Sequence, residues 1–65
     1  MEVGQTVYTV NNVTNKVDSW TYSGVLPTAN GKLIQLDKDN KTCWLPRKCV
    51  FETELEAKII AGSYH

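Results

Sequence analysis

A chain of 65 residues forms at most one small domain with a thin core, because a chain of this size buries only roughly 60% of the surface that its unfolded form exposes. Hydrophobic residues make up 42% of the chain, which argues against a disordered protein. Seven basic residues balance seven acidic ones, whereas proteins that bind nucleic acid usually carry an excess of basic charge. We therefore expect a single domain over residues 1–65, and the neutral balance counts against nucleic acid as a partner.

The sequence contains no segment typical of targeting or of membrane insertion. Residues 1–5 are polar and lack the apolar region of a secretory signal. No apolar run approaches the roughly 20 residues that a membrane helix needs. We therefore expect a cytoplasmic protein that does not associate with a membrane.

Three runs in the first part of the chain are predicted as strands. Residues 3–10 are rich in the β-branched and aromatic residues that strands favour. A second run covers residues 17–26, and a third covers residues 32–37. Asn30-Gly31 lies between the second and the third run, and both residues accept the positive φ of a type I′ turn. This dipeptide predicts a tight hairpin.

The second run leaves open which of its faces is buried. Trp20, Tyr22 and Leu26 have the same parity in this run, and Gly24 shares it. A glycine inside a strand often marks a bulge, and a bulge reverses the face on which the later residues lie. The alternation alone therefore does not assign the buried face.

Two further strands and a helix are predicted in the second part of the chain. A polar turn over residues 37–41 precedes a fourth strand over residues 42–45, and residues 49–51 form a short fifth strand. Five short strands with turns at this spacing predict a mainly β protein, either a five-stranded antiparallel meander or a small barrel. A barrel would also remove the exposed edges of the sheet.

A helix is expected over residues 54–61. Thr53 and Glu56 have the spacing of a capping box, in which each side chain hydrogen-bonds a backbone N–H group of the other. Apolar residues then recur at helical spacing, namely Leu55, Ala57, Ile59 and Ile60. Gly62 is placed to end the helix in a left-handed cap.

Both ends of the chain resemble a group of small bacterial and bacteriophage proteins of uncharacterised function. The resemblance lies in a G-x-x-V-Y opening strand, here residues 4–8, and a V-F-x-T-x-x-E-A strand-to-helix turn, here residues 50–57. It implies an SH3-like small barrel and a compact, phage-encoded accessory or interaction protein. It implies no ligand, no enzymatic activity and no functional residue.

Metal, cofactor and enzyme chemistry find little support in the sequence. Cys43 and Cys49 enclose five residues and are either free thiols or a bridged pair. A zinc site needs about four ligands, and the one further soft ligand is His65, at the end of the chain. The pair Asp37 and Asp39 would need a shaped pocket to act as acid and base. We expect no enzyme, no metal and no cofactor.

Aromatic residues supply the leading hypothesis for function. Trp20, Tyr22 and Trp44 are large, and a thin core does not bury all of them. They either fill the core or form an exposed strip that holds another protein, with Arg47 at its edge. Since aromatic and arginine side chains dominate interface energetics, we expect a protein-interaction module that binds a partner protein, such as a host protein of a phage.

Two alternatives remain open. The basic residues around the turns, Lys32, Lys41, Arg47 and Lys48, form a candidate nucleic-acid surface when combined with an aromatic side chain that stacks on bases. The second alternative is self-association through a strand edge, which a thin core makes plausible. The oligomeric state is left undetermined.

Overall fold

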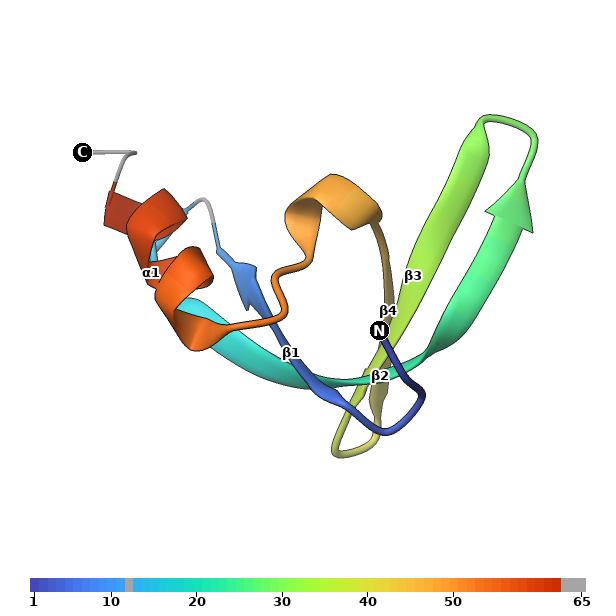
Figure 1. Ribbon diagram of the computed structural model, residues 1–65, viewed down its shortest axis with the longest axis horizontal. Helices are drawn as coiled ribbons and strands as arrows, with labels where there is room; N and C mark the ends of the chain where they lie inside the picture. The colour runs from blue at the N-terminus through green and yellow to red at the C-terminus, as the bar shows by residue number, and fades with distance from the viewer. Residues whose placement is uncertain (12, 63–65) are drawn as a thin grey trace.

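The computed structural model describes residues 1–11 and 13–62. Four antiparallel strands form one open sheet in the order of the chain: β1 (Thr6–Val10), β2 (Val17–Thr28), β3 (Gly31–Lys38) and β4 (Lys41–Pro46). A 3₁₀ turn, η1 (Arg47–Cys49), and one helix, α1 (Glu54–Gly62), follow (Figure 1). The prediction of a mainly β protein with one C-terminal helix is confirmed.

β1 begins three residues later than the sequence predicted. Gly4 adopts a φ of 94°, and the N–H of Gln5 donates to the carbonyl of Glu2 at 3.0 Å. Residues 2–5 therefore turn, because this backbone conformation is incompatible with an extended strand.

The hairpin between β2 and β3 lies where it was predicted, but its turn differs. Thr28 pairs with Gly31, so the loop consists of Ala29 and Asn30. The type I′ turn expected at Asn30-Gly31 is wrong by one position: Gly31 has a φ of 130°, while Asn30 is not among the described residues with positive φ. The Thr28 hydroxyl donates to the Gly31 carbonyl at 2.8 Å and fastens the loop.

A β-bulge in β2 assigns its faces. Tyr22 pairs with Leu36 and Gly24 with Gln35, so Ser23 is the additional residue. Trp20 and Tyr22 therefore share the face that carries Leu36, which we call the inner face. Leu26 pairs with Leu33 on the opposite, outer face, whereas without the bulge it would have followed Tyr22 inward.

The fifth strand predicted over residues 49–51 is wrong, and the sheet is not a closed barrel. Pro46 has no N–H and ends β4, and the next residues form η1, where the N–H of Val50 donates to the Arg47 carbonyl at 3.1 Å. Phe51 then makes an isolated bridge to Tyr8, with hydrogen bonds of 2.7 and 2.8 Å on the free edge of β1. One bridge therefore stands in place of a strand.

The helix begins where its sequence signals predicted. Its first turn is capped by the Thr53 hydroxyl, which accepts the N–H of Glu56 at 3.2 Å. Ala57 and Ala61 are buried against β1 and β2, and Leu55 and Ile59 point outward. The expected left-handed cap at Gly62 is wrong, because this residue is the last one of the helix and its φ is not positive.

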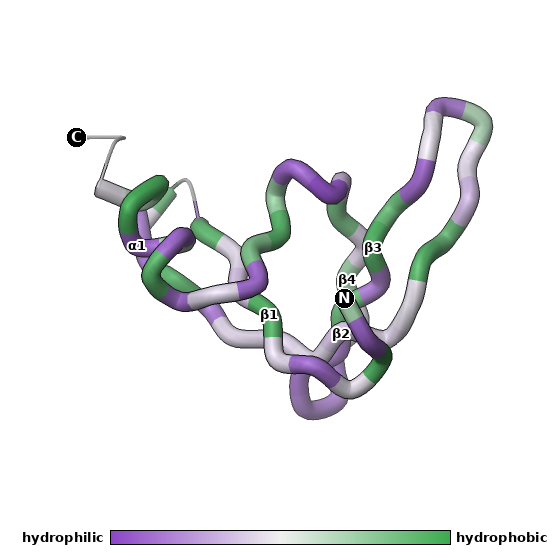
Figure 2. Tube along the Cα trace, viewed as in Figure 1, coloured by the Kyte–Doolittle hydropathy of each residue, from purple (hydrophilic) through white to green (hydrophobic). Residues whose placement is uncertain are grey.

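The core lies on the inner face, between the bent sheet and the chain that follows β4. Its buried residues are Val7, Tyr22, Ile34, Leu36 and Val50, with Trp20 and Leu45 packed against them. Figure 2 shows hydrophobic positions along the strands and a hydrophilic turn between β3 and β4. Among the described residues, no helix is long and apolar enough to cross a membrane.

Candidate functional site

The three aromatic residues of the predicted strip lie on two different faces of the sheet. Tyr22 is part of the core and only 8% exposed. Trp20 lies two residues before it on the same inner face, since alternate residues of a strand share a face. Trp44 pairs with Gln35, whereas its neighbour Cys43 pairs with Leu36, so Trp44 lies on the outer face. The structure therefore does not bring Trp44 together with Trp20 and Tyr22.

Trp20 is held in place by polar neighbours as well as by the core. Its indole N–H donates to the Thr9 hydroxyl at 2.9 Å. The Lys38 ammonium lies 5.5 Å from the ring centroid, within the range of a cation–π interaction. The same ammonium lies 3.6 Å from the Asp18 carboxylate. Trp20 is therefore a half-buried structural residue whose ring is partly covered by a paired lysine.

Trp44 lies in an apolar patch on the outer face, and this patch is our candidate site. Trp44 is 48% exposed, and Pro46 follows two residues later on the same face of β4. Leu33 pairs with Pro46 on one side and with Leu26 on the other. We call this surface the Trp44 patch; its apolar residues are Leu26, Leu33, Trp44 and Pro46, and the polar Gln35 lies directly opposite Trp44.

The Trp44 patch is open, and the core lies on the other side of its strands. Gly24 pairs with Gln35 next to Trp44, and a Cβ atom placed on Gly24 would meet nothing within 4 Å. The strands beneath the patch carry core residues Ile34 and Leu36 on their inner face. The outer face is therefore open around Gly24, and the strands that carry the patch pack against the core on their inner face.

Arg47 lies directly after the patch, but its guanidinium is already bonded within the chain. It donates to the Val50 carbonyl at 2.7 Å and lies 3.9 Å from the Glu52 carboxylate. These contacts hold η1 against the segment that leads to α1. The side chain is still 56% exposed, and Arg47 is close to the patch only through its place in the chain directly after Pro46.

The lysines of the nucleic-acid alternative do not form one cluster. Lys32 pairs with Pro27 next to the β2–β3 loop, and Lys41 pairs with Lys38 next to the β3–β4 loop, at the opposite end of β3. Lys48 lies in η1, which follows Pro46 at the Lys32 end of the sheet. Three of the four basic residues, Lys32, Arg47 and Lys48, thus belong to one end of the sheet and Lys41 to the other.

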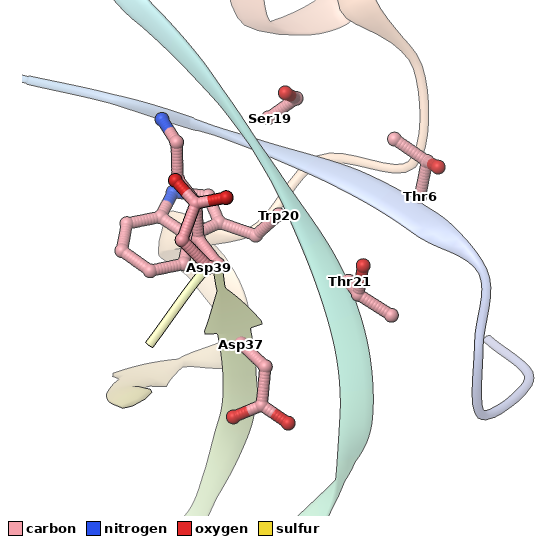
Figure 3. A pocket seen from close by; sticks show the side chains of 7 residues that line it. Thr6, Ser19, Trp20, Thr21, Asp37 and Asp39 are labelled. Carbon is pink, nitrogen blue, oxygen red and sulfur yellow. The ribbon is translucent and has the colours of Figure 1, made fainter. Parts of the chain in front are cut away.

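An open depression of about 280 Å³ lies where β2 bends away from the end of β3 (Figure 3). It is lined by three hydroxyl residues, two aspartates, one lysine and one tryptophan, namely Thr6, Ser19, Trp20, Thr21, Asp37, Lys38 and Asp39. The Asp37 carboxylate accepts hydrogen bonds from the Ser23 hydroxyl and, at 3.0 Å, from the Thr42 hydroxyl. Asp37 therefore links three strands on the outer face.

Both cysteines are free and half-buried. Cys43 lies on the inner face opposite Leu36, and Cys49 ends η1. Within residues 1–11 and 13–62, no group of three or more histidine, cysteine, aspartate or glutamate side chains is arranged to hold a metal ion. His65, the further ligand considered from the sequence, lies outside the described residues.

Sequence reasoning missed Leu26, Leu33 and Pro46 as members of the site. The signal that would have found Leu26 was Gly24, because a bulge at that glycine moves Leu26 to the face of Trp44. Leu33 shares its parity with Gln35, so its place beside Trp44 follows once the register of β3 and β4 is known.

Comparisons of the chain with protein-family models, with curated proteins and with solved structures found no match.

Proposed function

We propose that this protein is a small, non-enzymatic protein-interaction module that binds a partner protein through the Trp44 patch. The observation that carries the proposal is the position of Trp44, which is 48% exposed on the outer face beside Leu33 and Pro46. Tryptophan is enriched among the residues that contribute most to binding energy, and it contributes when a partner desolvates it.

The contrast between the two tryptophans supports this choice of surface. Trp20 already has a hydrogen-bond partner and a cation over its ring. Among the described residues, no hydrogen bond or cation–π contact involves the Trp44 side chain, so its indole N–H is available to a partner. Trp44 is therefore the tryptophan that a partner would engage, and Arg47 would lie at the edge of the interface.

We also propose that the fold is a shortened relative of the SH3-like barrel. The isolated bridge between Tyr8 and Phe51 supports this, because it returns the chain after β4 to the free edge of β1. A fifth strand at that place would join the two ends of the sheet. The phage-encoded, cytoplasmic accessory role implied by the resemblance of the two ends of the chain belongs to the same proposal.

The test is a capture experiment from nuclease-treated bacterial lysate, with the wild type, Trp44→Ala and Leu55→Ala. Leu55 is a matched control, because it is an exposed apolar residue on α1, away from the patch. We expect the wild type and Leu55→Ala to retain one stoichiometric protein that Trp44→Ala loses. The identified protein, once purified, should bind the wild type and Leu55→Ala and should not bind Trp44→Ala.

Two outcomes would contradict the proposal. Capture that Trp44→Ala leaves unchanged would remove the patch as the contact surface. Capture of nucleic acid alone from a parallel lysate without nuclease would favour the basic alternative, which predicts a steep loss of binding with salt and with Arg47→Ala plus Lys48→Ala.

A further inference from the structure

β4 is an edge strand with one unpaired side. Within the described part of the chain its only neighbour in the sheet is β3, and the two-residue loop Asp39-Asn40 joins Lys38 to its partner Lys41. The residues that close such a loop exchange both backbone hydrogen bonds, and such pairs alternate with non-bonded pairs along the ladder. The backbone groups of Thr42 and Trp44, together with the carbonyl of Pro46, therefore point away from β3.

The chain leaves this side of β4 without a partner. Among residues 1–11 and 13–62, no backbone hydrogen bond outside the ladder involves Thr42 or Trp44. The opposite edge of the sheet is different, because Tyr8 on β1 exchanges two hydrogen bonds with Phe51. The side chains of Thr42 and Trp44 are exposed on the outer face, so the free backbone groups lie beside the Trp44 patch.

The charged residues of β4 and η1 are all basic. Lys41 begins β4 and Lys48 lies in η1, and neither has an ion-pair partner among the described residues. Residues 41–49 include no aspartate or glutamate. A second copy of this strand would bring like charges together, and like charges placed opposite each other in a sheet are destabilising. The edge therefore favours a segment with acidic ends over a second copy.

We propose that the partner's contact segment is an extended strand with acidic residues at both ends, which pairs with the free edge of β4. This inference rests on the proposed function and names the form of its partner. Backbone hydrogen bonds to Thr42 and Trp44 would hold the strand, as in other cases of strand addition. Its side chains on the outer face would contact Trp44, and its acidic ends would lie near Lys41 and Lys48.

The test uses two synthetic peptides, EEVTVTEE and KKVTVTKK, titrated into the ¹⁵N-labelled protein. We expect the acidic peptide to slow hydrogen exchange of the amides of Thr42 and Trp44, and the lysine peptide to leave them unchanged. Equal protection by both peptides would overturn the proposal. So would the absence of protection up to about 1 mM, a concentration that half-fills a site worth about 4 kcal/mol.

A pair of variants tests the backbone bond itself. Thr42→Pro removes the outward N–H, and proline is tolerated on an edge strand when its N–H side faces solvent. Thr42→Val keeps the N–H, and both variants lose the hydroxyl that donates to Asp37. We expect Thr42→Pro to bind the acidic peptide about tenfold more weakly than Thr42→Val, the loss that one hydrogen bond accounts for. Equal affinity of the two folded variants would overturn strand addition.

The failure of this inference is distinct from the failure of the proposed function. If Trp44→Ala abolishes capture of a partner but the partner does not protect the Thr42 and Trp44 amides, the patch binds by side chains alone. If the acidic peptide protects these amides and Trp44→Ala leaves capture unchanged, the edge binds a strand and the patch is not the contact surface.

Discussion

The indole N–H of Trp20 donates to the hydroxyl of Thr9 over 2.9 Å, and this bond joins β2 to β1 on the inner face of the sheet. Thr9 is buried, at 7% exposure, and its neighbour across the ladder is Asp18. The bond therefore lies at the margin of the core, where it satisfies two polar groups that the fold removes from water.

Trp20 should be important for stability, and Trp44 should not. We expect Trp20→Phe to cost about 1 kcal/mol of unfolding free energy, because it removes the bond to Thr9 while keeping a ring. Trp20→Ala should cost about 2 kcal/mol, because it also removes packing against the core. Trp44→Ala should cost less than about 1 kcal/mol. Urea unfolding followed by circular dichroism measures all three, and a larger loss for Trp44→Ala than for Trp20→Ala would contradict this assignment.

Gly24 should resist substitution although space surrounds it. Its φ of 144° lies in a region that residues with a side chain rarely adopt, so Gly24→Ala should cost about 1 to 3 kcal/mol. Gly62 provides the control, because it is also surrounded by open space but lies in α1. Gly62→Ala should leave stability unchanged or raise it by less than about 1 kcal/mol. Equal effects of the two substitutions on the urea midpoint would mean that the backbone at Gly24 is not strained by a side chain.

The cap at Thr53 should set the stability of α1. Thr53→Ala removes the acceptor for the Glu56 N–H and should cost about 1 kcal/mol. Thr53→Ser keeps a hydroxyl at the same place and should stay close to the wild type. Thermal unfolding of the three proteins at pH 7 gives the comparison, and a Thr53→Ser variant as unstable as Thr53→Ala would show that the threonine methyl group, not the hydroxyl, matters.

The ion pair on α1 predicts a small effect of alkaline pH. The hydrogen bond from Lys58 to the Glu54 carboxylate, at 2.8 Å, raises the pKa of the Lys58 ammonium, and the carboxylate charge adds to this. A raised pKa means that the folded state holds the proton more tightly. The ion pair therefore stabilises the fold fully below the pKa of Lys58 in the unfolded chain, and this stabilisation is lost as pH rises through the pKa of Lys58 in the folded protein. The difference in urea midpoint between the wild type and Lys58→Met should therefore vanish at high pH. A difference in urea midpoint that persists at high pH would show that packing of the lysine stem, not the ion pair, causes it.

Local signals account for the parts of the fold that the sequence predicted well. The polar segment at 37–41 and the Asn30-Gly31 region both lie at hairpin turns, and Thr53 does begin the helix. Such signals act through backbone conformations and hydrogen bonds over three or four residues, so they do not depend on the rest of the chain. The same reasoning failed at residues 49–51, where an apolar run with no ladder to join became η1 and a single bridge.

The sequence by itself determined the order of the four strands and the helix, because their turns and cap are short-range. The tertiary structure alone decided which aromatic residues face the core and which face outward. One additional residue at Ser23 reverses the alternation of β2, and pairing with β3 reveals the reversal. It separates Tyr22 from Leu26. The register of β4 sends Trp44 to the outer face, beside an edge whose outward backbone groups have no backbone partner in the described chain. These relationships depend on hydrogen bonds between distant residues, which no local pattern encodes.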